Sequence, residues 1–267
     1  MRLAFSTLGV PGMPLPQVLR LAADHGFHGV ELRTHPEEPV HTGLSPAQRA
    51  TVAEEFEATG IRPLALAGYP RVAAPGEDGP VLDKTRELLH LARDLGAPFV
   101  RVFPGGGDAA PEEADAAAVR RLTALAPSAE DAGVRLLLET HDSHLTGAAV
   151  ARVLEAVGHD SVGALWDTLH TWRGGEEPEA TYDALGPYLG YVQVKDAASA
   201  DDLTPLPLGD GTLPLTEVIE QLSRAGQEAD CWLCWEYEKR WYPSVPGIDP
   251  LLPGAADHLR RLLAASA

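Results

Sequence analysis

Side chains that can bind a metal ion stand at the ends of apolar runs that lie far apart in the sequence. They are Glu139 after 136–138, Asp167 after 162–166, Gln193 within 191–194 and Glu236 after 231–235. If these runs are parallel strands of one closed barrel, the side chains converge at the carboxyl end of the strands, where barrel enzymes keep their chemistry. Three carboxylates and an amide around one point make an oxygen-rich site for a hard divalent cation.

The shared position of these residues is what favours a site. Helix capping or a surface salt bridge explains any one of Glu139, Asp167 and Glu236 alone, but it is a poor explanation for all of them at the same end of their strands. His170 follows Asp167 by three positions and can be a ligand or a donor to a bound hydroxyl. His141, just after Glu139, either orients a ligand or is an ordinary loop residue.

Strand-like runs alternate with helix-like patterns along the chain. Alternating β and α units imply a parallel sheet with right-handed crossovers. A Rossmann sheet is disfavoured, because no Gly-x-Gly-x-x-Gly follows any strand. We therefore predict a single α/β domain over 1–267, a (β/α)8 TIM barrel with long loops at 70–80 and 197–211 over its mouth. The predicted strands are 3–7, 29–33, 62–68, 99–103, 135–139, 162–167, 189–195 and 231–236, and the predicted helices are 16–25, 46–60, 80–95, 112–132, 146–157, 179–188, 214–225 and 254–265.

Strand geometry adds a consistency check, because alternate residues point to opposite faces. If Glu236 faces the barrel axis, Cys234 and Trp232 do too. If Gln193 faces inward, so does Lys195, one step nearer the rim. A charged group in this place is costly unless it is paired or bound to a metal.

The amino-acid composition limits the kinds of binding partner and cellular location that we expect for this protein. The net charge of −18 repels phosphate backbones, so we expect no nucleic-acid partner, and solubility is the simplest reason for the charge. No run is continuously apolar for the roughly 18 residues of a membrane span, and the first nine residues are a poor signal peptide, so we expect a cytosolic protein. Cys231 and Cys234 are three apart on one strand, so we expect structural thiols rather than a redox pair.

Several stretches resemble the xylose isomerase-like barrel superfamily, in its sugar phosphate isomerase/epimerase branch. The matching stretches are 26–32 (GFHGVEL), 138–142 (LETHD), 165–170 (LWDTLH), 192–196 (VQVKD) and 235–243 (WEYEKRWYP). They are spread over most of the chain, and the Asp-x-x-His and final Glu segments are fairly specific in combination. The resemblance implies one divalent metal ion held by Glu139, Asp167, Gln193 and Glu236, with His170 in contact with a sugar-like substrate.

Gln193 departs from the commonest pattern, because many members have histidine there. Glutamine occurs in the hydroxypyruvate isomerase-like branch. An amide oxygen is a hard neutral ligand, so we expect Mn²⁺ or Mg²⁺ to be favoured over Co²⁺ or Zn²⁺. Endonuclease IV-type members need further histidines where this chain has Ala67-Gly68 and Phe103-Pro104, and this disfavours a nuclease.

These features predict a metal-dependent isomerase or epimerase of a sugar, sugar phosphate or related hydroxy-carbonyl compound. The hard step is removal of a proton next to a carbonyl, and the metal would stabilise the resulting enediolate. Glu139 and Glu236 are the natural pair to take and return the proton. Lys195 either meets a substrate anion or the developing oxyanion, or forms only a salt bridge at the rim. Arg101 either reaches a substrate anion or pairs inside the barrel.

The sequence is also compatible with other functions. The same enediolate can expel a leaving group, which would make the protein a lyase or dehydratase of a sugar-like or secondary-metabolite acid. Gln193 also leaves open a barrel that binds without turnover. Glu31 and Arg33, at the end of the second predicted strand, are undecided in the same way as Arg101. Neither substrate identity nor assembly into a homo-oligomer follows from the fold.

Overall fold

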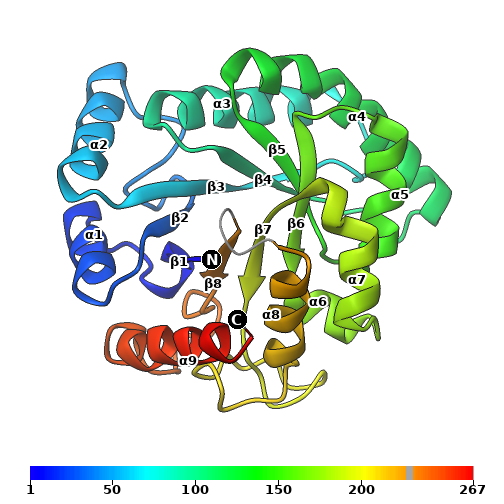
Figure 1. Cartoon of the computed structure of the whole chain (residues 1–267). Helices are drawn as coiled ribbons and strands as arrows, with labels where there is room; N and C mark the ends of the chain where they lie inside the picture. The colour runs from blue at the N-terminus through cyan, green and yellow to red at the C-terminus, as the bar shows by residue number, and fades with distance from the viewer. Residues whose placement is uncertain (227–230, 267) are drawn as a thin grey trace.

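The structure, a computed structural model, describes residues 1–226 and 231–266. Within these residues, eight parallel strands follow one another around a closed barrel in which β8 pairs with β1, and the helices surround the strands (Figure 1). The prediction of a (β/α)8 TIM barrel is confirmed. The strands are β1 (Arg2–Ser6), β2 (Gly29–Arg33), β3 (Arg62–Arg71), β4 (Phe99–Phe103), β5 (Arg135–Glu139), β6 (Val162–Asp167), β7 (Leu189–Val194) and β8 (Trp232–Trp235).

The helices begin and end at local signals in the sequence, as α2 shows. Ser45 and Gln48 form a capping box, in which each side chain accepts a hydrogen bond from the backbone N–H of the other. Pro46 takes the first helical position, and Gly60 ends the helix with a φ of 70°. The helices are α1 (Leu15–Asp24), α2 (Pro46–Thr59), α3 (Gly79–Leu95), α4 (Pro111–Ala132), α5 (Gly147–Val157), α6 (Thr168–Arg173), α7 (Pro178–Leu185), α8 (Leu215–Arg224) and α9 (Leu252–Ala265), with short 3₁₀ turns η1 (Thr7–Gly9), η2 (Gly186–Tyr188) and η3 (Asp249–Leu251).

The structure differs from the predicted elements in a few places. The third strand continues to Arg71 instead of ending at residue 68. Helix α6 was not predicted; it starts directly after β6, because the Asp167 side chain accepts a hydrogen bond from the backbone N–H of Leu169 in its first turn. The predicted helix 179–188 is divided into α7 and η2, because Pro187 has no N–H with which to continue an α-helix.

The apolar core has an inner part and an outer part. The inner part fills the barrel with Ala4, Leu64, Ala65, Leu137, Leu165, Tyr191, Trp232 and Cys234. Leu233 and Trp235 belong instead to the core between strands and helices, so the predicted alternation along β8 is confirmed. Cys231 and Cys234 are both free and buried. No helix in the described ranges is long and apolar enough to cross a membrane.

Arg121 of α4 anchors the loop between β3 and α3 and is 1% exposed. Its Nη1 donates to the carbonyl oxygens of Val72 at 3.0 Å and Ala74 at 2.6 Å, and its Nη2 donates to that of Gly76 at 2.8 Å. Its Nε donates to Asp78 Oδ1 at 2.7 Å. One buried guanidinium thus sets the course of a loop beside the barrel mouth.

Asp196 anchors the loop between β7 and α8 in a similar way. Its carboxylate accepts backbone N–H groups of Ala197 at 3.1 Å, Gly209 at 2.8 Å, Gly211 at 3.0 Å and Leu213 at 3.3 Å. A Cβ at Gly211 would lie only 2.1 Å from Asp196 Oδ1. Glycine is therefore required for the loop to approach the carboxylate this closely.

Candidate metal and active site at the barrel mouth

A cavity of about 50 Å³ lies among the carboxyl ends of the strands. At about 10–15 Å³ for each water, it holds only a few water molecules. Of the predicted site residues, Arg101, Glu139, Lys195 and Glu236 line it. Its other lining residues are Leu8, Tyr69, Phe103, His141, Glu238 and Trp241.

The remaining predicted residues are buried against these. Asp167 Oδ2 is 2.7 Å from Lys195 Nζ, and Gln193 Nε2 is 3.1 Å from Glu236 Oε1. His170 Nε2 is 3.7 Å from Asp167 Oδ2. The barrel thus brings the residues predicted from the sequence into one connected cluster.

The Gln193 amide has a defined orientation. Its Nε2 donates to Glu31 Oε2 at 2.8 Å as well as to Glu236. Glu31 Oε2 also accepts from the Tyr191 hydroxyl at 2.5 Å. Because carboxylate oxygens accept, the NH₂ end of the amide must face them. Gln193 Oε1 therefore faces away from these carboxylates.

The buried oxygens of the cluster fit a hard cation. In the described part of the chain, Gln193 Oε1 is buried without a hydrogen-bond partner. Glu139 Oε2 and Asp167 Oδ2 also lack a hydrogen bond, but they form ion pairs with Arg101 at 3.1 Å and Lys195 at 2.7 Å. Buried oxygens in native structures normally have hydrogen-bond partners, so the Gln193 oxygen calls for an explanation such as an ion. Together with Glu236, these oxygen donors suit Mn²⁺ or Mg²⁺.

Lys195 holds part of the same donor set. Its Nζ is 2.7 Å from Asp167 Oδ2, 2.5 Å from Glu236 Oε2 and 2.8 Å from Glu238 Oε1. Burial disfavours a charge here, but Asp167 and Glu236 raise the pKa of Lys195 well above its usual value, so the side chain stays cationic. The salt-bridge alternative for Lys195 is therefore observed, although in a buried place rather than at an exposed rim.

A second group of potential ligands adjoins Glu139. The ligand atoms of Glu139, His141 and His170 lie within 4.8 Å of one another, and the two imidazole rings have centroids 4.1 Å apart. Among the described residues, this group of metal-ligand atoms excludes Asp167 and Glu236, whose carboxylates contact Lys195. His141, left undecided from the sequence, thus lies in the site. Nitrogen ligands of this kind would favour zinc over manganese.

Arg101 pairs inside the barrel. Its Nε lies 3.1 Å from Glu139 Oε2, and its guanidinium carbon lies 3.8 Å from the centroid of the Phe103 ring. Its Nη1 is buried without a hydrogen-bond partner in the described residues. One edge of Arg101 is thus free to donate to an oxygen of a bound molecule.

Burial controls the protonation of the site. It raises the pKa of Glu139 to about 8, against the opposing charge of Arg101. Burial also lowers the pKa of His170 well below its usual value, and the charge of Lys195 adds to this, so that imidazole is neutral. For His141, burial is outweighed by the hydrogen bond with Asp142 and the charge of Glu139, and its pKa is raised.

These shifts predict how the stability of the metal-free protein depends on pH. Glu139 keeps its proton up to a pH of about 8 in the folded state but loses it near 4.5 when unfolded. The folded state therefore binds more protons between these values, and the contribution of Glu139 to stability falls as the pH rises through this window. We expect the unfolding temperature in EDTA to fall less steeply from pH 5.5 to 8 for Glu139→Gln than for wild type. If the unfolding temperatures of the two proteins fall in parallel with pH, the raised pKa of Glu139 is contradicted. The difference between the two curves cancels the effect of all other titrating groups.

The fold and the strand-end residues can now be compared with known proteins. Residues 19–264 match the xylose isomerase-like TIM barrel family. The chain belongs to this family. A putative hydroxypyruvate isomerase of Streptomyces coelicolor is 28% identical over 91% of this chain and 92% of its own length. A 3-dehydroshikimate dehydratase of Bacillus anthracis is 24% identical over 70% of this chain and 68% of its own length.

Solved structures share the fold of this chain. A crystal structure of the IolI protein with a bound zinc atom has a TM-score of 0.85 and 22% identity, and the match covers 100% of this chain and 99% of that one. At this identity the likeness concerns the fold. The family match over residues 19–264 confirms the resemblance to the xylose isomerase-like superfamily inferred from the sequence.

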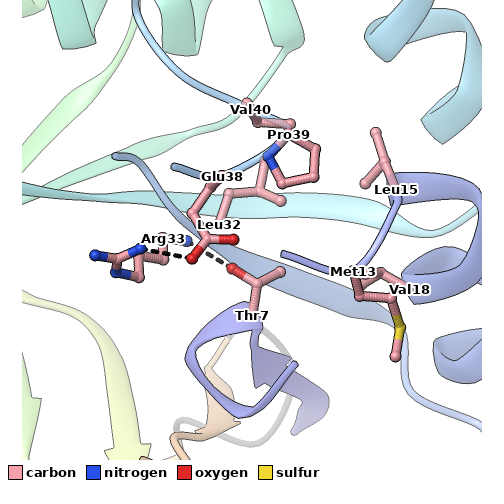
Figure 2. Close-up of a pocket in the computed structure, with 9 residues that line it drawn as sticks. All are labelled: Thr7, Met13, Leu15, Val18, Leu32, Arg33, Glu38, Pro39 and Val40. Carbon is pink, nitrogen blue, oxygen red and sulfur yellow. Dashed lines mark hydrogen bonds and ion pairs between the residues drawn. The ribbon is translucent and has the colours of Figure 1, made fainter. Parts of the chain in front are cut away.

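Arg33, undecided from the sequence, is held in the wall of a neighbouring pocket. Its Nη1 is 2.5 Å from Glu38 Oε1, its Nε donates to the Tyr69 hydroxyl at 2.7 Å, and its backbone N–H donates to Thr7 Oγ1 at 2.8 Å. Figure 2 shows the Glu38 carboxylate directed at Arg33 beside the apolar side chains that line this pocket. The Arg33 guanidinium therefore forms part of the wall of this neighbouring pocket and does not line the central cavity.

Several residues of the site were missed in the sequence. Glu238 and Tyr191 lie two positions from Glu236 and Gln193, so strand alternation pointed to both. Tyr69 lies in the part of β3 beyond the predicted end at residue 68, and Trp241 lies in the loop after β8, so strand alternation pointed to neither. Glu31 contacts Gln193 across 162 positions of sequence, a pairing that only the closed barrel creates.

Proposed function

We propose that the protein is a divalent-metal-dependent isomerase or epimerase of a sugar or related hydroxy-carbonyl compound. The observation that carries the proposal is the pair of carboxyl groups, Glu139 from β5 and Glu236 after β8, that line one small cavity. Two such groups on opposite sides of a substrate allow a proton next to a carbonyl to be taken by one group and returned by the other.

The residues that would hold the metal are Glu139, Asp167, Gln193 and Glu236. The unpartnered Gln193 Oε1 and the carboxylates that lie beside it in one buried cluster support this set. When bound, a divalent cation would supply stabilisation of negative charge on the substrate oxygens. The Glu139–His141–His170 group is the competing ligand set, and the metal retained by the purified protein distinguishes them.

The protein's own side chains divide the work. Glu139 and Glu236 accept and donate the proton from two different strands that meet at the cavity. The free edge of Arg101 donates to a substrate oxygen, and neutral His170 contacts a substrate hydroxyl. We retain Lys195 as a substrate contact, because it lines the same cavity.

The test is solvent exchange. Protein loaded with Mn²⁺ is incubated in D₂O with a panel of ketoses, aldoses and keto acids, and each compound is followed by NMR and mass spectrometry. Deuterium at the carbon next to the carbonyl, together with an isomeric product, is expected. Loss of water from a substrate acid would instead favour the dehydratase alternative, which the relative from B. anthracis keeps open. No exchange with any compound would favour a binding protein.

The proposed ligand role of Gln193 gives a prediction of its own. Gln193→His is expected to keep metal binding and to shift preference from Mn²⁺ towards Zn²⁺ or Co²⁺, because imidazole is a softer ligand than an amide. Titration calorimetry with each metal on both proteins measures the shift. Wild type that hardly binds Mn²⁺, beside a variant that binds it strongly, would move the assignment from enzyme to binding protein.

A further inference from the structure

The ammonium of Lys195 lies where a cation would be expected to bind. It contacts Asp167 and Glu236, two of the proposed metal ligands, at 2.7 and 2.5 Å. Such distances are those of direct ion pairs between buried groups, since the Lys195 side chain is 6% exposed and that of Asp167 0%. Without a positive charge at this point, the buried carboxylates would repel one another.

The contacts of Lys195 are not equivalent. Three carboxylates among the described residues pair with Lys195. Of these contacts, only the one with Glu238 Oε1, at 2.8 Å, has hydrogen-bond geometry. Asp167 Oδ2 has no hydrogen-bond partner despite its distance of 2.7 Å. The Glu238 side chain is also the most exposed of the group, at 21%. Lys195 therefore has a hydrogen-bonded partner, Glu238, that is not a proposed metal ligand.

We propose that Lys195 is a tethered cation that takes the place of the divalent ion between Asp167 and Glu236, and that Glu238 retains its ammonium when the ion binds. The proposal rests on the metal site of the proposed function. Exchange of one cation for another keeps the buried carboxylates neutralised in both states. Withdrawal of Lys195 towards Glu238 also enlarges a cavity that otherwise holds only a few water molecules.

The proposal makes opposite predictions for two substitutions. Lys195→Met removes the competing charge and keeps the length of the side chain, so Mn²⁺ is expected to bind at least about tenfold more tightly. Glu238→Gln leaves the ammonium with Asp167 and Glu236 as its only charged partners in the described cluster. Mn²⁺ is then expected to bind about three- to tenfold more weakly.

The experiment is titration calorimetry of the metal-free full-length proteins with MnCl₂. Lys84→Met is the matched control, because it removes one positive charge at an exposed position outside the cluster; its affinity should equal that of wild type within about twofold. Circular dichroism confirms that each protein is folded. If Lys195→Met does not fold, the Glu238→Gln comparison decides alone.

The outcomes separate this inference from the proposed function. The role of Lys195 is overturned if Lys195→Met binds Mn²⁺ no more tightly than wild type does, or if Glu238→Gln binds it as tightly as wild type does. Either result leaves the proposed metal-dependent enzyme intact. Failure of every protein to bind Mn²⁺ overturns both. Binding by Lys195→Met but not by wild type supports the tethered cation and argues against a metal-dependent wild-type enzyme.

Discussion

Glu236→Gln is expected to lower turnover of the substrate found by solvent exchange by at least about 10²-fold while the barrel stays folded. Glutamine keeps an oxygen that can accept from Gln193 Nε2, now at 3.1 Å from Glu236 Oε1. It cannot accept a proton from substrate carbon, and it loses the charge 2.5 Å from Lys195. Turnover at saturating Mn²⁺ and the unfolding temperature are measured together, so that a loss of activity is separated from a loss of structure.

Glu139→Gln is the companion measurement. If the reaction uses a carboxyl group on each side, both variants lose turnover, but they differ in which half-reaction exchanges deuterium. Turnover within a few-fold of wild type for Glu236→Gln would remove Glu236 from proton transfer. The same result for Glu139→Gln alone would leave a one-sided mechanism, in which a single group takes and returns the proton.

Arg121→Met is expected to destabilise the protein by about 3 kcal/mol, the size typical when one partner is removed from a buried charged network. The loss arises because the carbonyl oxygens of Val72, Ala74 and Gly76 lose a charged donor inside the structure. Urea denaturation of the metal-free protein measures the change in the free energy of unfolding.

Arg120→Met is a closely matched control. Arg120 is the neighbour of Arg121 on α4 and donates to the same Asp78, but its side chain is 55% exposed. An exposed ion pair contributes little to stability, so this change should cost much less free energy of unfolding than Arg121→Met. Equal effects of the two substitutions would show that burial of Arg121 does not matter to the loop.

Much of the fold could be predicted because its signals are local. Apolar runs mark the strands, and glycines such as Gly60 and Gly96 end helices in the left-handed conformation. Helix α6 escaped prediction because it is short and its N-cap, Asp167, was assigned to the site. The division at Pro187 was visible in the sequence, and a proline so near the end of a predicted helix argues for an earlier stop.

The site could be predicted only in outline. Strand ends place Glu139, Asp167 and Glu236 at one mouth, because parallel strands align their carboxyl ends. The partners of these residues depend on distances across the barrel. Nothing local shows that Lys195 would meet Glu238 or that Glu31 would orient the Gln193 amide.

Trp241 gives the protein an optical reporter at the cavity. It is 51% exposed, whereas Trp166 and Trp235 are fully buried, so its indole is the one most open to quenching among the described residues. The ring stacks on the guanidinium groups of Arg33 and Arg240, at 5.5 and 5.9 Å from its centroid. Trp241 also lines the central cavity, so a molecule bound there lies beside this indole. Its fluorescence can therefore follow binding in real time, without a label and before any reaction is known.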